Sequence, residues 1–189
     1  MCRSPTHPLF PKAMERHKLT LMSDLATGIR HAKPADAAAI AGVFEAAWRE
    51  AYRGIIPGVA LDKMIARRGP RWWRSPARRG RPLAVLDIGG TIAGYASYGR
   101  SRHRSLRAEG EIDELYLAPE YQGLGFGRRL FRAVRNDLSD RHAGPVVVWA
   151  LAANERACAF YEGRGGRRVA ETTERIGGAD LAKIAYLFD

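Results

Sequence analysis

The sequence predicts an α+β fold, or a mixed α/β fold, in which a sheet is flanked by helices. The hydrophobic periodicity changes along the chain in the order strand, two helices, three strands, helix, strand, helix and two strands. The chain has 189 residues, of which 46% are hydrophobic. This length is enough for one packed core and too short for two ordinary domains, so we expect a single domain.

The first half of the chain begins with "TGIRHA", which predicts a short strand. Residues 33–54 then predict a helix with Pro34 in its first turn and Asp36 near its positive end. Gly54 is expected to end this helix, and "VALDKMIARR" predicts a second one. The strands "PLAVLDI" and "TIAGYASYGR" are separated by two glycines, which are typical of a tight hairpin turn.

The second half begins with the strand "EIDELYLAP", which Pro119 ends because proline cannot donate a sheet hydrogen bond. A helix follows, with Leu130 and Val134 in its apolar stripe. The segment "GPVVVWALA" predicts a buried strand, and "NERACAFYEGRGG" predicts a helix capped by Asn154. The last two strands are expected in "RRVAETTERI" and "AKIAYLFD".

The formal net charge of +11 favours anionic partners of every kind, including nucleic acid and phosphorylated cofactors. Residues 67–81 interleave arginine with Trp72 and Trp73, a mixture that can stack on bases. The alternative is a solvated arginine-rich loop with both tryptophans in the core. We favour this alternative.

The cysteines are Cys2 and Cys158, without a metal-type spacing, so we expect a reduced intracellular protein and no metal site. No apolar run approaches the roughly 18 residues of a membrane span, and the first residues lack a signal-peptide core, which favours a cytoplasmic protein. Residues 1–23 are proline-rich and aperiodic. We expect a flexible extension there, a domain over residues 24–189, and Met22 as a candidate start of a shorter native chain.

The segment "YQGLGFGRRLF" places Gly123, Gly125 and Gly127 between a strand and a helix. A helix start presents free backbone N–H groups and the positive end of the helix dipole, so it can bind an anion. Glycines let a diphosphate approach the backbone closely. Arg128 and Arg129 follow in the first helical turn, where a bound anion would offset their charge.

Two common phosphate loops fit this segment poorly. A Walker loop needs lysine and a hydroxyl residue after its last glycine, and neither follows Gly127. A dinucleotide loop has the spacing G-x-G-x-x-G early in the chain and an acidic residue at the end of the next strand. Here the spacing is G-x-G-x-G, and the next strand ends in "ALAAN".

The segment "ELYLAPEYQGLGFGRRLF" resembles the acetyl-coenzyme A signature of the GCN5-related N-acetyltransferase (GNAT) superfamily, [QR]-x-x-G-x-[GA], with Gln122, Gly125 and Gly127 at its positions. "NERACAFYEGRGGRRV" and "AAWREAYRGIIP" are similar to two further regions of this family. The resemblance covers residues 27–189 and implies a central, mostly antiparallel sheet that is splayed at the cofactor site. Gly166 departs from the family's usual aromatic residue, which predicts a looser loop.

The resemblance implies direct transfer of an acetyl group from acetyl-CoA to a primary amine of a small molecule or protein, through a ternary complex. The backbone of Leu115, Tyr116 and Leu117 would hold the pantetheine arm and polarise the thioester. The diphosphate would lie in the loop formed by Gln122, Gly123, Leu124, Gly125, Phe126, Gly127 and Arg128. Asn154 would contact the cofactor arm, and Tyr161 would be the general acid at the sulfur.

Each chemical role has a structural alternative. Asn154 can be only a helix cap, and Tyr161 can only fill core space beside Phe160. We favour Glu114 as the general base because it shares a strand face with Tyr116 in an ideal strand. Glu114 can also be a solvated charge or a structural partner for an arginine.

Two other function classes are compatible with the sequence: a catalytically idle acyl-CoA-binding sensor or interaction module of the same fold, and a nucleic-acid-binding module. We favour the enzyme, with acetyl-CoA and an amine as its partners and no membrane; a homodimer stays open because dimers are frequent in the family. The acceptor would be set by "RGIIPGVALDK" and by residues 67–81 and 101–110. Their positive charge would repel cationic amines and tolerate acidic acceptors.

Overall fold

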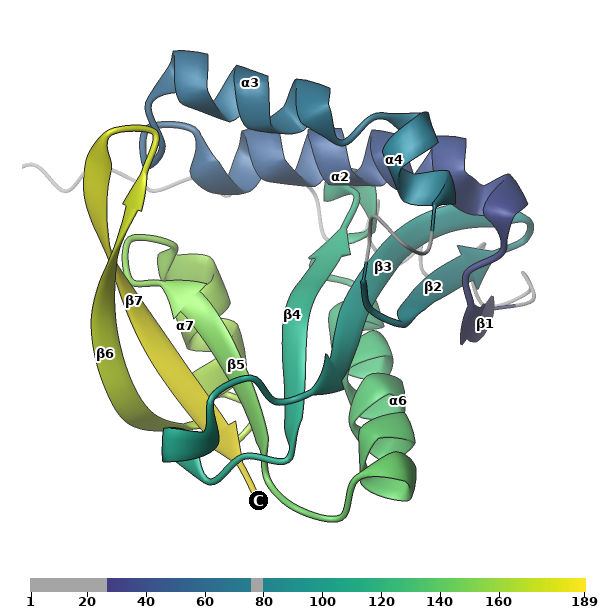
Figure 1. Cartoon of the computed structure of the whole chain (residues 1–189). Coiled ribbons are helices and arrows are strands. Elements are labelled where there is room, and N and C mark those ends of the chain that lie inside the picture. Colours follow the sequence, from purple (N-terminus) through teal and green to yellow (C-terminus); the bar gives the residue numbers. More distant parts are fainter. Residues whose placement is uncertain (1–26, 76–79) are drawn as a thin grey trace, which may run out of the picture.

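A computed structural model describes residues 27–75 and 80–189 (Figure 1). The expected extension at residues 1–23 and the candidate start Met22 lie outside the described residues, as do residues 76–79 of the arginine-rich segment. Within the described ranges, no helix combines the length and the apolar character that a membrane crossing requires.

The structure confirms the predicted fold class and the order of its elements. The strands are β1 (Thr27–His31), β2 (Leu83–Ile88), β3 (Thr91–Arg100), β4 (Gly110–Leu117), β5 (Val146–Leu151), β6 (Arg167–Ile176) and β7 (Ala179–Phe188). The helices are α2 (Ala37–Tyr52), α3 (Gly58–Arg67), α4 (Pro70–Arg74), α6 (Phe126–Arg141) and α7 (Glu155–Glu162). Three short 3-10 turns are η1 (Pro34–Asp36), η2 (Arg104–Leu106) and η3 (Pro119–Tyr121).

The first predicted helix begins with the 3-10 turn η1 and continues as α2, which ends at Tyr52. Arg53 is the C-cap residue, with an extended backbone at φ −60° and ψ 125°. Gly54 follows with a left-handed backbone, at φ 80°, so it lies where a glycine is expected to end a helix.

The arginine-rich segment is partly helical, because α4 forms where a loop was expected. Trp73 is buried and packs edge to face against Tyr95, with ring centroids 4.9 Å apart. Trp72 is half-buried, and the Arg68 guanidinium lies 4.3 Å from the centre of its ring. The two tryptophans therefore pack against the protein, as we favoured, although only Trp73 is fully buried.

The strands form one seven-stranded sheet with the order β1-β2-β3-β4-β5-β7-β6. Every neighbouring pair is antiparallel except β4 and β5, which are parallel. These two strands pair only from Gly110 opposite Val146 to Ile112 opposite Val148. Beyond Ile112 they diverge towards α2 (Figure 1), β4 continuing along β3 and β5 along β7. The structure thus has the expected splay.

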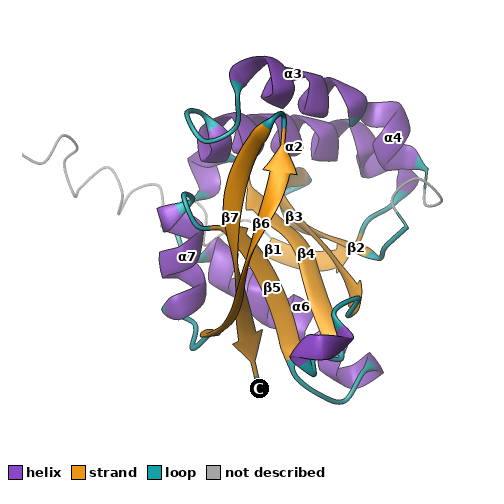
Figure 2. Cartoon of the chain, turned by 60° about the vertical axis from the view of Figure 1, so that its left-hand side comes forward, coloured by secondary structure: helices purple, strands orange, loops and turns teal. Residues whose placement is uncertain are grey.

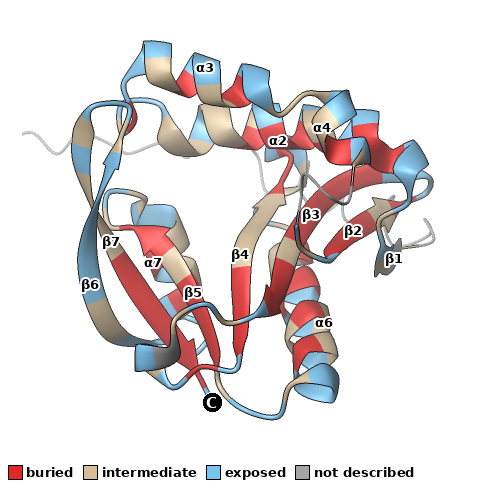
Figure 3. Cartoon of the chain, in the orientation of Figure 1, coloured by how far each residue is buried: buried red, intermediate tan, exposed pale blue. Residues whose placement is uncertain are grey.

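Helices cover both faces of the sheet (Figure 2). On one face α6 and α7 pack with the sheet around a core that contains Leu130 and Tyr186. On the other face α2, α3 and α4 surround a second core that contains Phe44 and Tyr95. The buried stretches of β3, β4 and β5 lie between these layers (Figure 3).

A β-bulge in β4 decides which face each of its later residues occupies. Ser97 pairs with Glu114 but Tyr98 pairs with Ile112, so Asp113 is an extra residue in β4. After the bulge, Leu115 and Leu117 contact the core of α6 and α7, and Tyr116 contacts the core of α2.

The loop after α7 is tight rather than loose, which corrects the expectation drawn from Gly166. The N–H of Gly166 donates a 3.0 Å hydrogen bond to the carbonyl oxygen of Tyr161. A Cβ at Gly166 would lie 2.7 Å from the ring of Phe188 and 2.9 Å from that carbonyl oxygen. Phe188 thus occupies the space beside Gly166, so an aromatic side chain there would collide with it.

We expect Gly166→Ala to lower the free energy of unfolding by about 1–3 kcal/mol, because the added methyl group overpacks this contact. Urea unfolding followed by circular dichroism measures the change. Gly28→Ala is the matched control, since a Cβ there meets no atom within 4 Å. Equal stability of the two variants would contradict this account of the loop.

Candidate active site

A cavity of about 710 Å³ lies where β4 and β5 diverge. Its walls come from α2, the end of β4, the start of α6, and α7 with the residues that precede it. The lining residues are Ala47, Glu50, Ala51, Ile55, Leu115, Tyr116, Leu117, Gln122, Gly123, Gly125, Gly127, Arg128, Ala153, Asn154, Glu155, Arg156, Ala157, Phe160, Tyr161 and Arg164.

Ten of the residues expected to bind the cofactor line this cavity, namely Leu115, Tyr116, Leu117, Gln122, Gly123, Gly125, Gly127, Arg128, Asn154 and Tyr161. Leu124 and Phe126 do not line it, because their side chains pack against the core beside α6. These two apolar side chains anchor the glycine loop to the core. Any contact of Leu124 or Phe126 with a ligand would therefore come from backbone atoms.

The glycines of this loop have backbone conformations that other residues avoid. Gly123 has φ 76° and Gly125 has φ 83°, both in the left-handed region. Gly125 is the N-cap residue of α6, and no side chain caps this helix. The first intrahelical bond runs from the N–H of Arg129 to the carbonyl oxygen of Gly125, so three earlier N–H groups lack a helical acceptor. This end of α6 is therefore suited to an anion.

The two arginines at the start of α6 differ in position. Arg128 lines the cavity. Arg129 does not, and its guanidinium lies 6.0 Å from the centre of the Phe126 ring. Of these two arginines, Arg128 alone adds its charge to the cavity. Arg156 and Arg164, from the α7 side, supply two further cations to the lining.

Tyr161 lies on α7 with its ring buried and its residue at the cavity wall. Burial raises the pKa of its hydroxyl well above the ordinary tyrosine value, so the hydroxyl keeps its proton at neutral pH. Among the described residues, no hydrogen-bond partner engages this hydroxyl. Tyr161 thus fills core space beside Phe160 and also holds a proton that it can donate into the cavity.

Asn154 is the N-cap of α7, and its Oδ1 accepts a 3.1 Å hydrogen bond from the N–H of Ala157. The helix-cap interpretation is therefore correct. Asn154 also lines the cavity, and its side-chain NH₂ group is left to donate. The two roles use different atoms of one side chain.

Glu114 does not line the cavity, so the structure does not bring it together with Tyr161. Its carboxylate accepts hydrogen bonds from Arg68 and, at 3.1 Å, from the hydroxyl of Tyr95. Burial raises its pKa, and the Arg68 charge opposes this increase. This environment matches the alternative in which Glu114 is a structural partner for an arginine.

Glu50 of α2 is a site residue that the sequence analysis missed. Its Oε2 accepts a 2.9 Å hydrogen bond from Gln122 Nε2, and its Oε1 accepts a 3.0 Å hydrogen bond from Arg156 Nη1. Gln122 Nε2 also donates to the carbonyl oxygen of Leu117 at 3.0 Å, so both of its protons are used. Glu50 thus connects α2 to the glycine loop and to α7.

The sequence carries no clear signal for Glu50, which reads as an ordinary charged residue after the apolar stripe of α2. Its partners lie 72 and 106 positions further along the chain, so the sequence could not identify them.

The profile of the Acetyltransferase (GNAT) family matches residues 42–165. An uncharacterized N-acetyltransferase, YuaI of Bacillus subtilis (strain 168), is 31% identical over 156 residues, which cover 82% of this chain and 89% of YuaI. The L-amino acid N-acyltransferase MnaT of Escherichia coli (strain K12) is 26% identical over 144 residues, covering 72% of this chain and 77% of MnaT.

Structural comparison gives the same fold. The PaiA N-acetyltransferase of Thermoplasma acidophilum, solved in complex with coenzyme A, superposes with a TM-score of 0.67 at 16% identity. The match covers 86% of this chain and 99% of PaiA. The chain belongs to the GNAT family of acetyltransferases.

We expect Glu50→Gln to weaken coenzyme A binding about three- to tenfold relative to Glu155→Gln, as measured by isothermal titration calorimetry. Both variants remove one negative charge from the cavity wall, but only Glu50 connects α2 to Gln122 and Arg156. Tighter binding by Glu50→Gln than by Glu155→Gln would show that the Glu50 contacts obstruct the ligand rather than order its site.

Proposed function

We propose that this protein is an acetyl-CoA-dependent N-acetyltransferase that transfers the acetyl group directly to a primary amine in a ternary complex. The observation that carries the proposal is the cavity at the β4–β5 splay, which combines an uncapped helix start, the unshared edge of β4 and the Tyr161 hydroxyl. Family membership supports the transferase class, and the coenzyme A complex of PaiA supports the donor.

The residues of the cavity fit an extended donor with an anionic end. The start of α6 and Arg128 would hold the diphosphate through backbone N–H groups and one cation. Beyond Ile112, β4 pairs with β3 alone, so the other edge of Leu115, Tyr116 and Leu117 would offer backbone groups to the amides of the pantetheine arm. The Leu117 carbonyl oxygen is the exception, because Gln122 Nε2 already donates to it. The NH₂ group of Asn154 would donate to the same arm.

The donor supplies the acetyl group as a thioester. In the transfer, the amine nitrogen bonds to the acetyl carbon, the carbon–sulfur bond breaks, and the nitrogen loses a proton to water. Tyr161 would give its proton to the departing sulfur and recover one from solvent. Backbone N–H groups of the free β4 edge would stabilise the developing oxyanion.

Glu114 enters this proposal as a structural residue, because Arg68 and Tyr95 hold its carboxylate outside the cavity. The proposal includes both small-molecule and protein amines as acceptors, and the relative MnaT, an L-amino acid N-acyltransferase, favours a small one. We propose a cytoplasmic location. A catalytically idle acyl-CoA-binding module is the alternative, and turnover distinguishes it from an enzyme.

We expect Gly125→Glu to abolish coenzyme A binding in calorimetry without unfolding the protein, because a carboxylate would occupy the anion site. Gly90→Glu is the matched control: Gly90 also has a left-handed backbone, with φ 87°, and open space around it, but lies in the β2–β3 turn. Both variants therefore introduce similar backbone strain. Retained binding by Gly125→Glu would remove the assignment of this loop.

We expect the protein to release free thiol from acetyl-CoA in the presence of an amine, and Tyr161→Phe to reduce kcat by about a hundredfold or more. Its affinity for coenzyme A should be unchanged, because the lost hydroxyl acts only on the leaving sulfur. Tyr186→Phe is the control, since Tyr186 is buried nearby but donates its hydroxyl to Glu162. Unchanged turnover of Tyr161→Phe at saturating amine would refute the acid role.

A further inference from the structure

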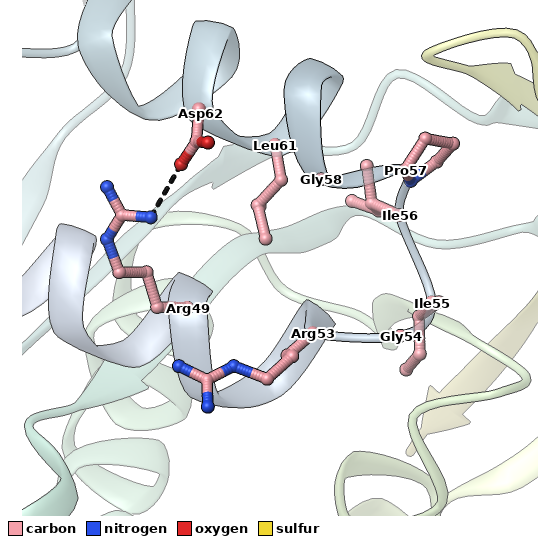
Figure 4. Close-up of a pocket in the computed structure, with 9 residues that line it drawn as sticks. All are labelled: Arg49, Arg53, Gly54, Ile55, Ile56, Pro57, Gly58, Leu61 and Asp62. Carbon is pink, nitrogen blue, oxygen red and sulfur yellow. Dashed lines mark hydrogen bonds and ion pairs between the residues drawn. The ribbon is translucent and has the colours of Figure 1, made fainter.

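A second cavity, of about 440 Å³, lies where α2 leads into α3 (Figure 4). Its lining residues are Arg49, Arg53, Gly54, Ile55, Ile56, Pro57, Gly58, Leu61 and Asp62. Ile55 lines both this cavity and the donor cavity at the β4–β5 splay. The two spaces are therefore neighbours on either side of one side chain.

The cavity has an excess of positive charge. Arg49 is already engaged, since it donates to Glu45 Oε1 at 3.1 Å and to Asp62 Oδ1 at 2.6 Å. Arg53 is the residue directly after α2, and its side chain extends to the same side as that of Arg49 (Figure 4). Within the described part of the chain, no hydrogen bond or ion pair occupies its guanidinium. Two arginines and one aspartate thus leave one uncompensated cation in the lining.

The rest of the lining is largely apolar. Ile56 and Leu61 are buried, Ile55 is half-buried, and Pro57 completes this side of the wall. A planar guanidinium forms paired hydrogen bonds with a carboxylate or a phosphate, and a carboxylate is the smaller of the two beside an apolar wall. The cavity volume is in the range of small-molecule sites. The cavity therefore fits a small ligand with a carboxylate and an aliphatic body.

We propose that this cavity binds the acceptor and that the acceptor is a small amino acid with an aliphatic side chain. Arg53 holds the carboxylate, Ile55, Ile56 and Leu61 contact the side chain, and the amino group is directed past Ile55 towards the donor cavity. This inference rests on the proposed acetyltransferase function and names its substrate class. It gives Arg53 a role in specificity and none in the transfer step.

The test compares L-leucine with L-leucinamide, which lacks the carboxylate, as acceptors in the thiol-release assay. In Arg53→Gln we expect the kcat/KM for leucine to fall about tenfold and that for leucinamide to stay unchanged. The ratio of kcat/KM for leucine to kcat/KM for leucinamide is compared between variants. The different basicities of the two amines affect this ratio equally in each variant, so they cancel. Arg53→Lys should retain part of the preference, since it keeps the charge without the paired geometry.

Arg67→Gln is the matched control. Arg67 is also an exposed arginine beside a cavity, but that cavity lies between α3 and the tip of the β6–β7 hairpin. It shares no residue with the donor cavity, and it shares Pro57 alone with the second cavity. This variant should leave the leucine to leucinamide ratio unchanged. An equal fall for both acceptors in Arg53→Gln would overturn the inference, as would preferential use of a leucine-initiated peptide with an amidated carboxyl end.

A direct titration keeps the inference separate from the function on which it rests. L-leucine is titrated calorimetrically into the wild-type protein and into Arg53→Gln, each with and without coenzyme A. Weaker leucine binding by Arg53→Gln supports the carboxylate site, even if no amine is acetylated and the proposed function fails. Absence of leucine binding to the wild type in both states overturns the site, even if other amines are acetylated.

Discussion

Beyond Ile112, β4 hydrogen-bonds to β3 alone, because β5 turns away and follows β7. Backbone N–H and C=O groups need partners when they are removed from water. The free edge of β4 therefore requires solvent or a ligand with amide groups, and the cavity forms at this edge. Helices pack on both faces of the sheet around this edge, with α6 and α7 on one core and α2 on the other.

The start of α6 adds positive charge beside this edge of β4. The left-handed backbone at Gly123 and Gly125 turns the chain so that α6 begins beside the end of β4. A Cβ at either glycine would meet no atom within 4 Å, so the conformation rather than local crowding explains these two residues. Arg128 then faces the cavity, and the site gains positive charge from both the backbone and a side chain.

Helix α2 connects this donor site to its surroundings. Ala47, Glu50 and Ala51 face the cavity at the β4–β5 splay, whereas Arg49, together with Arg53 just after the helix, lines the second cavity. Glu50 is held by groups from two separate elements, so a movement of α2 would change the positions of both. One helix thus couples the walls of the two cavities.

Much of the fold and of the donor site was predictable, because the signals are local. Strand periodicity, the hairpin glycines and the spacing around Gln122, Gly125 and Gly127 act over a few residues, and the structure has the corresponding elements. The helix-cap role of Asn154 was anticipated from its place before the helix, and Asn154 also lines the cavity.

The carboxylates were harder to assign, because their roles depend on distant partners. An ideal strand placed Glu114 beside Tyr116, but it could not reveal that Arg68 and Tyr95 would hold its carboxylate outside the cavity. Glu50 was not predicted as a site residue, because an exposed carboxylate on a helix is common. Its role depends on Gln122 and Arg156, which only the structure places beside it.

By itself, the sequence determined the α+β class, the glycine turn that begins α6 and the presence of a tyrosine on α7, because backbone preferences and short spacings specify them. Only the tertiary structure decided which side chains share a cavity. That choice depends on where β4 parts from β5 and on the bulge at Asp113, and both depend on packing between segments that are far apart in the chain.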